Sequence, residues 1–293
     1  MGLITKILGG IYTVFEGSAY YDCRARGLFR HKGETPLVGD RVDIDVDEFG
    51  KGTIQKILPR QNEFIRPPVA NVDIMVIVAS AAIPVTEPFL IDRMAAVAAS
   101  AGVTPVICIN KSDLDSADKL FDIYSRGVFP TFRVSAETGD GIGALIDALY
   151  GSTSVLTGNS GVGKSSILNA LGLKIAVGEV SNKLGRGRHT TRHVEIHTLI
   201  NPKGPDACVI DTPGFSSFDT GKMALTEQSD IYHGFPEFEP FLGKCRFRDC
   251  VHVKEPGCAV LEALGDGLIN ESRHRSYVML LDTAKELKAR EYK

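Results

Sequence analysis

The segment Gly158 to Ser165 has the spacing GxxxxGK[ST], which is typical of a loop that binds nucleotide phosphates. Glycines let backbone N–H groups turn toward a phosphate, and the N-terminus of the following helix adds partial positive charge. Lys164 would neutralise the β and γ phosphates, and Ser165 would ligate Mg²⁺. The residues that we expect to contact the nucleotide here are Gly158, Asn159, Ser160, Gly161, Val162, Gly163, Lys164, Ser165 and Ser166.

A second acidic motif, Asp211-Thr-Pro-Gly214, follows the phosphate loop by about 45 residues and ends an apolar run. In this position a DxxG sequence suits the γ-phosphate end of a nucleotide. Asp211 would hold Mg²⁺ through water, and the amide of Gly214 would sense the γ-phosphate.

The motif Asn110-Lys111-Ser112-Asp113 predicts that the base is guanine. The carboxylate of Asp113 can accept hydrogen bonds from N1–H and the exocyclic amine of guanine, a pair that adenine does not offer. Asn110 can bridge to the phosphate loop, and Lys111 can lay its alkyl stem along the ring. Ser135 and Ala136, in a Ser-Ala-Glu sequence, fit a loop whose backbone N–H contacts guanine O6. The four motifs together predict GTP or GDP as the ligand.

The order of these motifs is circularly permuted, because Asn110–Asp113 and Ser135–Ala136 precede the phosphate loop. In familiar small GTPases the phosphate loop comes first. The same sheet can form with the chain cut elsewhere, and the segment after Asp211 then leads directly into the C-terminal part of the chain.

The segment Ser181–Val194 has four cationic residues, two histidines and no acid. Either Thr190 or Thr191 would close on Mg²⁺ and the γ-phosphate, and we favour Thr191. Phe215 stands where familiar GTPases carry a glutamine that orients water, so hydrolysis should be slow or another residue should place the water. His189 is the candidate, since a neutral imidazole can orient or deprotonate water. The alternative is that His189 contacts a phosphate or RNA.

Three of the six cysteines, Cys245, Cys250 and Cys258, cluster with His252. Three thiolates and one imidazole suit a tetrahedral Zn²⁺ with a complete protein shell, which indicates a structural site and not a catalytic one. A disulfide would leave one cysteine unpaired. Cys108 and Cys208 lie in apolar runs and fit a core.

The pattern of elements divides the chain into three parts, 1–66, 67–225 and 226–293. The first part has short strands broken by turns, typical of a small barrel. The second alternates strands with helices, which predicts an α/β fold with a mostly parallel sheet. Its expected strands are 72–82, 104–109, 132–135, 154–157, 194–200 and 207–210, and its helices 89–100, 116–126, 141–150 and 164–171. The third part has helical segments at 258–264 and about 270–289.

Composition excludes a membrane span and a general attraction to nucleic acid. The chain of 293 residues has a net charge of −3, and no apolar run approaches the roughly 18 residues that a span needs. The N-terminus lacks a signal peptide, so we expect a cytoplasmic protein, and with no oligomer signal we expect a monomer. Two small basic groups could contact phosphates or simply be solvated: Arg24, Arg26, Arg30, His31 and Lys32, and Lys244, Arg246 and Arg248.

The motif order, the sequence LGRGRHTTRHVE, the DTPGF turn and the Cys/Cys/His/Cys cluster together resemble the small ribosomal subunit biogenesis GTPases, known as RsgA, YjeQ or YloQ. The resemblance covers the whole chain. It implies an N-terminal OB-fold β-barrel that binds RNA, a permuted P-loop GTPase domain and a C-terminal zinc-binding domain. It also implies binding to the small ribosomal subunit and its rRNA late in assembly, with slow hydrolysis that the subunit stimulates. It assigns the zinc to Cys245, Cys250, His252 and Cys258, and a catalytic role to His189.

Two other functions are compatible with the motifs. A regulatory GTPase with a protein partner, for example in cell-envelope growth, would use the barrel to bind protein, with little dependence on salt. A metabolic GTPase would need a second substrate pocket, of which the sequence gives no sign.

Overall fold

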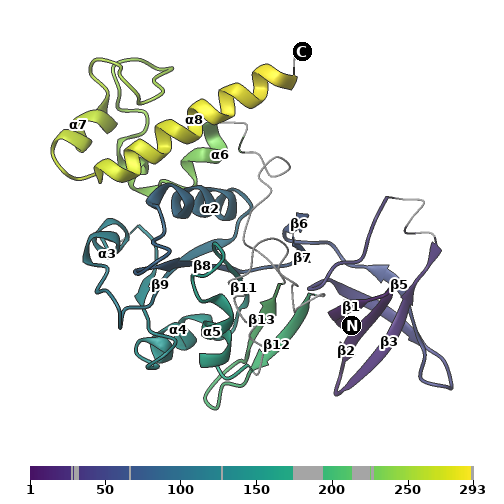
Figure 1. Cartoon of the computed structure of the whole chain (residues 1–293). Helices are drawn as coiled ribbons and strands as arrows, with labels where there is room; N and C mark the ends of the chain where they lie inside the picture. Colours follow the sequence, from purple (N-terminus) through teal and green to yellow (C-terminus); the bar gives the residue numbers. More distant parts are fainter. Residues whose placement is uncertain are drawn as a thin grey trace, which may run out of the picture.

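The computed structural model describes residues 1–27, 29, 33–65, 67–126, 128–173, 194–212, 225 and 228–291. Within these residues one eleven-stranded sheet connects the N-terminal barrel to the central domain, in the order β10-β9-β8-β11-β13-β12-β1-β2-β3-β5-β4 (Figure 1). The remaining described strands, β6 (Glu63–Ile65) and β7 (Pro68–Ala70), form a separate hairpin.

The first five strands form the predicted barrel. They are β1 (Gly2–Leu8), β2 (Ile11–Glu16), β3 (Ala19–Ala25), β4 (Arg41–Val46) and β5 (Gly52–Ile57). Antiparallel pairing of β1 with β4 closes the barrel, since β1 also pairs with β2. Alternate side chains point inward, and the fully buried Ile4, Val14, Cys23, Val42 and Ile54 make its core.

The central sheet is parallel through β10 (Thr131–Arg133), β9 (Thr104–Asn110), β8 (Ile74–Ser80), β11 (Thr153–Thr157) and β13 (Ala207–Asp211). The neighbouring β12 (Glu195–Leu199) runs antiparallel to β13. The bounds of these strands lie within two residues of the predicted ranges. β8 is buried on both faces, as its uninterrupted apolar sequence requires.

Helices cover both faces of this sheet, as predicted. α2 (Pro88–Ser100) and α3 (Asp118–Tyr124) pack into one core, and α4 (Ile142–Leu149) and α5 (Lys164–Ala170) pack into the other. Figure 1 shows the C-terminal helices on the outer side of α2.

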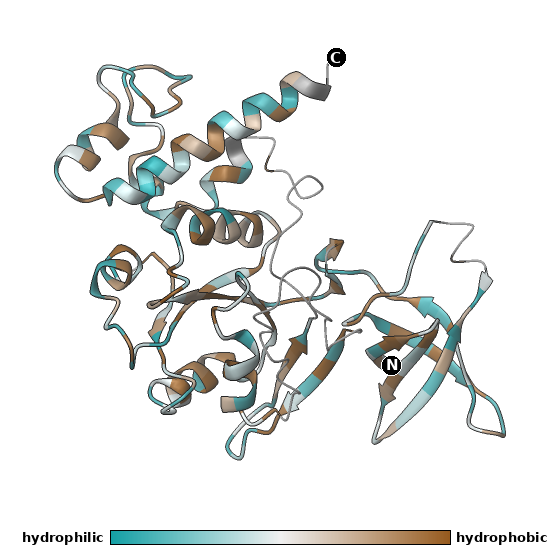
Figure 2. Cartoon of the chain, in the orientation of Figure 1, coloured by the Kyte–Doolittle hydropathy of each residue, from teal (hydrophilic) through white to brown (hydrophobic). Residues whose placement is uncertain are grey.

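The C-terminal part contains α6 (Gln228–Tyr232), a 3₁₀ helix η1 (Pro236–Phe241), α7 (Ala259–Gly265) and α8 (Glu271–Glu291). The sequence predicted α7 and α8 and gave no periodicity for α6 or η1. In Figure 2, α8 carries both brown and teal bands, and its buried residues Tyr277, Leu280 and Leu281 pack with Phe235 and Phe238. Gly234 lies so close to Ala96 of α2 that a Cβ at Gly234 would overlap it.

A buried arginine joins this C-terminal part to the central domain. Arg273 of α8 donates from Nη1 to Asp92 of α2 at 2.6 Å, and from Nε and Nη2 to Glu237 of η1 at 2.8 and 3.0 Å. The hydroxyl of Tyr124 also donates to Asp92, at 2.8 Å. Arg273 and Asp92 are fully buried, so helices from three parts of the sequence share one charged centre.

The hairpin of β6 and β7 spans the expected first domain boundary, since Glu63 pairs with Ala70 across residues 66 and 67. Asn71 then donates to the carbonyl of Gly39 in the barrel at 2.9 Å. The division of the chain at 66 and 225 therefore stays a prediction. No helix among the described residues has the length and apolar character that a membrane crossing requires.

Candidate functional site

The predicted nucleotide motifs meet at one edge of the central sheet. Asn110 is the last residue of β9, Thr157 the last of β11 and Asp211 the last of β13. Because these strands are parallel, their carboxyl ends lie side by side, which is where ligands bind in such sheets.

The phosphate loop follows β11 and leads into α5 at Lys164, as predicted. Gly158, Gly161 and Gly163 have φ values of 144°, 82° and 96°, which favour glycine. A Cβ at Gly163 would overlap the amide of Asn110, and one at Gly158 would overlap the carbonyl of Val78. The loop can therefore keep this path only with glycine at these positions.

The ammonium of Lys164 lies inside the loop that it follows. Its Nζ donates to the carbonyls of Gly158 at 2.6 Å and Asn159 at 2.9 Å. Burial lowers the pKa of Lys164 to about 8. Ser165 beside it is half-buried and Ser166 is exposed.

Nucleotide binding is expected to take up protons near pH 8. Phosphates would stabilise the charged form of Lys164 and raise its pKa, so affinity should fall as pH rises past the free-state value of about 8. Calorimetric titration in buffers of different ionisation enthalpy measures this uptake. Uptake that is unchanged in Lys164→Met would assign the protons to another group.

Asn110 connects the predicted guanine motif to the phosphate loop and to the Ser135–Ala136 loop. Its side chain is 2% exposed, donates from Nδ2 to the carbonyl of Val162 at 2.9 Å and accepts at Oδ1 from the amide of Ala136 at 3.1 Å. The structure thus brings three of the predicted motifs into direct contact through one amide.

Asp113 is held by the hydroxyl of Ser135, which donates to Oδ1 at 2.7 Å. Ser135 Oγ in turn accepts from the amide of Thr138 at 3.1 Å. The amide of Ser112 donates to the carbonyl of Val134 at 3.2 Å, which fixes the backbone between the two motifs. These bonds set the direction of the carboxylate.

Sequence reasoning missed the segment that follows β8. Lys111, in a left-handed conformation at φ 67°, donates from Nζ to the carbonyl of Ile83 at 2.8 Å. A Cβ at Gly161 would lie 3.3 Å from the ring of Pro84. Residues 83 and 84 carry no nucleotide-binding signature, so only the fold reveals that they border the site.

The predicted switch residues His189, Thr190, Thr191 and Gly214, and also Phe215, lie outside the described residues. Asp211 is described, ends β13 and is 8% exposed. Of the predicted Mg²⁺ ligands, the structure therefore places Ser165 in the first turn of α5, which follows β11, and Asp211 at the end of the adjacent strand β13.

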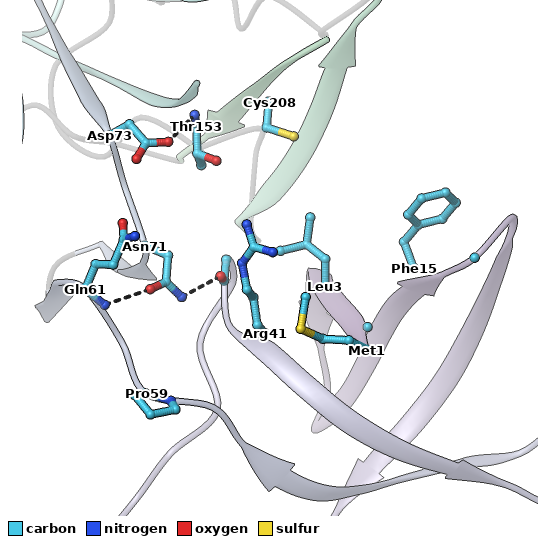
Figure 3. Close-up of a pocket in the computed structure, with 13 residues that line it drawn as sticks. Met1, Leu3, Phe15, Arg41, Pro59, Gln61, Asn71, Asp73, Thr153 and Cys208 are labelled. Atoms are coloured by element: carbon cyan, nitrogen blue, oxygen red, sulfur yellow. Dashed lines mark hydrogen bonds between the residues drawn. The ribbon is translucent and has the colours of Figure 1, made fainter. Parts of the chain in front are cut away.

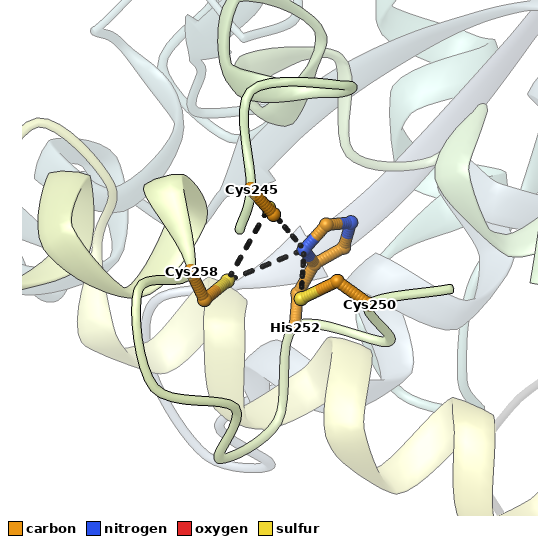
Figure 4. A group of neighbouring side chains, drawn as sticks. All are labelled: Cys245, Cys250, His252 and Cys258. Carbon is orange, nitrogen blue, oxygen red and sulfur yellow. Dashed lines mark hydrogen bonds between the residues drawn. The ribbon is translucent and has the colours of Figure 1, made fainter. Parts of the chain in front are cut away.

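Cys245, Cys250, His252 and Cys258 converge between η1 and α7 (Figure 4). Nδ1 of His252 lies 3.5, 3.4 and 3.3 Å from the sulfurs of Cys245, Cys250 and Cys258, and Cys245 lies 3.8 Å from Cys258. Metal–sulfur bonds of about 2.3 Å and metal–nitrogen bonds of about 2.0–2.1 Å in a tetrahedron give edges of about 3.8 and 3.5 Å. The four groups could therefore hold one tetrahedral metal ion.

Surrounding residues shape this cluster. Glu255 accepts from the amides of Val253 at 2.9 Å and Lys254 at 3.0 Å, and His274 Nε2 lies 2.8 Å from the carbonyl of His252. Burial raises the pKa of Cys250 to about 12 and lowers that of His252. Without a cation the thiol of Cys250 stays protonated, so a bound metal must displace its proton.

The chain is similar over its whole length to proteins of one family. The model of the RsgA GTPase matches residues 57–221, and that of the RsgA N-terminal domain matches residues 1–54. A relative from Geobacillus kaustophilus, named small ribosomal subunit biogenesis GTPase RsgA, is 42% identical and covers 99% of both chains. A relative of the same name from Caldanaerobacter subterraneus is 39% identical over 100% of this chain and 98% of its own.

Two solved structures have the same fold. YjeQ from Thermotoga maritima superimposes with a TM-score of 0.78 at 35% identity and covers 97% of each chain. YloQ, described as a circularly permuted GTPase, gives a TM-score of 0.77 at 34% identity, over 99% of this chain and 95% of its own.

Proposed function

The chain belongs to the RsgA GTPase family, and from this we propose that it binds the small ribosomal subunit and hydrolyses GTP during late assembly of that subunit. We propose further that hydrolysis is slow alone and accelerated by the subunit. The observation that carries the proposal is the single side chain of Asn110, which contacts both the phosphate loop and the Ser135–Ala136 loop. That contact supports binding of a guanine nucleotide. The name of the relatives supports the small ribosomal subunit as the partner.

Each part of the nucleotide site receives a role in this proposal. Asp113 reads the base, while the Gly158–Ser166 loop and Lys164 hold the phosphates. Ser165, Asp211 and Thr191 would hold Mg²⁺, which supplies charge neutralisation at the β and γ phosphates when it is bound. A backbone N–H of the Ser135-Ala136-Glu137 loop would contact guanine O6, and the amide of Gly214 would contact the γ-phosphate.

The experiment is to measure GTP turnover with and without purified small subunits over a salt series, with large subunits as the control. We expect manyfold acceleration by small subunits only, decreasing as salt rises because rRNA phosphates are contacted. Acceleration by neither subunit, together with no nucleotide-dependent co-sedimentation, would contradict the proposal and favour a GTPase with a protein partner.

His189 is proposed as the residue that places the attacking water. His189→Ala is expected to reduce stimulated turnover by about 10²-fold, a typical general-base contribution, while nucleotide affinity is kept. Stopped-flow binding of a fluorescent GDP and single-turnover hydrolysis measure the two quantities. Unchanged turnover would assign the water to another group, and a loss of subunit binding would show an RNA contact instead.

The cysteine cluster is proposed as a structural Zn²⁺ site that supports α7 and the start of α8. Metal analysis should find about one zinc per chain, and Cys250→Ser should lose it and unfold the C-terminal part, because structural zinc supplies folding free energy. Cys208→Ser is the matched control, since Cys208 lies in β13 and belongs to no described ligand group. Full zinc content in Cys250→Ser would show that the cluster holds none.

The remaining proposals, on RNA contacts, location and oligomeric state, follow from the small ribosomal subunit as the proposed partner. The N-terminal barrel, residues 1–66, would contact rRNA, and Lys244, Arg246 and Arg248 beside the cluster could contact phosphates as well. Such a protein would act in the cytoplasm as a monomer. Equilibrium sedimentation tests the oligomeric state.

A further inference from the structure

Three charged residues form a row across the joint between the barrel and the central domain. Lys6 of β1 is the register partner of Glu195 of β12, and Glu195 is the register partner of Asp211 of β13. Lys6 Nζ lies 2.9 Å from Glu195 Oε2. Directly opposite residues of antiparallel strands point to the same face of the sheet, so one barrel cation and two carboxylates lie in line.

The row ends in the nucleotide site. Asp211 is the residue that we propose for Mg²⁺, and it is the last residue of β13. Two carboxylates opposite each other repel, and Lys6 offsets this repulsion by pairing with the outer one. The barrel therefore supplies the charge that sets how Glu195 lies beside Asp211.

Among the described residues, strand pairing between the barrel and the central sheet occurs only near the C-terminal end of β1. Lys6 with Glu195 is the sole register pair between β1 and β12. Beyond it a cavity of about 360 Å³ separates Leu3 and Arg41 of the barrel from Asp73, Thr153 and Cys208 of the central domain (Figure 3). Asn71, which lines this cavity, also donates to the carbonyl of Gly39 in the barrel at 2.9 Å, so the ion pair is one of several contacts at the joint and the one whose register row continues to Asp211.

Apolar packing also links β1 of the barrel to the start of β12. Ile7, next to Lys6, packs against the barrel core and also against the central core that contains Val194 and Ile196. A displacement of β1 would therefore be passed to the start of β12 through both the ion pair and this contact.

We propose that the row Lys6–Glu195–Asp211 couples occupancy of the barrel to the nucleotide site. This rests on the proposed function, in which the barrel contacts rRNA. Coupling between two binding sites is reciprocal, so the bound nucleotide must also alter the state of β1 in the absence of any ribosomal subunit.

The first test is charge reversal with rescue. Lys6→Glu is expected to keep basal turnover within about twofold, since a half-exposed ion pair contributes little alone. Stimulation by small subunits should fall about fivefold or more, the lower range of allosteric coupling factors. The double variant Lys6→Glu/Glu195→Lys should regain most of the stimulation.

The matched control is Lys56→Glu, an exposed barrel lysine whose register partner is Asp43 of the barrel. It makes the same change of charge without touching the joint. An equal loss of stimulation in Lys56→Glu, or no loss in Lys6→Glu, would overturn the proposal.

The second test needs no ribosome. Hydrogen exchange of the β1 amides is compared between the GDP-bound protein and the protein with a non-hydrolysable GTP analogue. We expect a difference in the wild type that Lys6→Glu abolishes. If subunits fail to stimulate the wild type while this difference persists, the proposed function fails and the coupling stands; identical exchange of β1 in both nucleotide states refutes the coupling.

Discussion

Asp113→Asn is expected to weaken GTP binding by about 10²- to 10⁴-fold and to admit xanthine nucleotide. Two hydrogen bonds from guanine to a carboxylate contribute about 1.5–3 kcal/mol each, and an amide cannot accept both. Ser135 can still donate to the remaining oxygen of Asn, as it does to Asp113 Oδ1 at 2.7 Å. The amide nitrogen would then face the base, where it suits the C2 carbonyl of xanthine and opposes the amine of guanine.

Competition between GTP and XTP for a fluorescent nucleotide measures this change. Asp115→Asn is the control, because Asp115 is exposed and its Oδ1 accepts only a local bond from the amide of Ala117 at 2.7 Å among the described contacts. An asparagine can keep that bond, so GTP preference should stay. Undiminished GTP selectivity in Asp113→Asn would contradict the assignment of the base.

Arg273→Met is expected to destabilise the packing of the C-terminal part on α2 by about 3–5 kcal/mol, because one partner of a buried ion pair is removed. Asp92 would be left fully buried without its cation, and Glu237 would lose two bonds. Burial already raises the pKa of Asp92, so its carboxyl would become protonated in the variant. The methionine fills the volume and restores none of these bonds.

Urea unfolding followed by circular dichroism measures the loss. Arg275→Met, two residues further along α8, is the control: its partner Glu271 and Arg275 itself are 82% and 69% exposed. An exposed pair of this kind contributes about 0–1 kcal/mol. Equal destabilisation by the two variants would show that the buried network contributes no more than a surface pair.

The positions of the nucleotide motifs at the strand ends could be predicted because the signals are local. Gly158–Ser165 and Asn110–Asp113 are each contiguous in the sequence, and each stands at the end of an apolar run that formed the expected strand. The cluster of Cys245, Cys250, His252 and Cys258 is local for the same reason. In these cases residue types and spacing suffice to predict which side chains the fold brings together.

The features that sequence reasoning missed depend on partners far away in the chain. Arg273 lies in a helix with many charged residues and has the pattern of a solvated side chain, yet its partner Asp92 is 181 residues away. Ile83 contributes a carbonyl, which any residue carries. α6 and η1 are short, so their helical form depends on packing against α2 and α8, not on periodicity.

The pairing of Lys6 with Glu195 also sets an order of events while the chain is being made. These residues are 189 positions apart. β1 is synthesised first, but it can pair with β12 only after two thirds of the chain has emerged. The barrel closes earlier through β1 and β4, which are near in sequence. We therefore expect a nascent chain released before β12 to contain a folded but undocked barrel, with docking as a late step of vectorial folding.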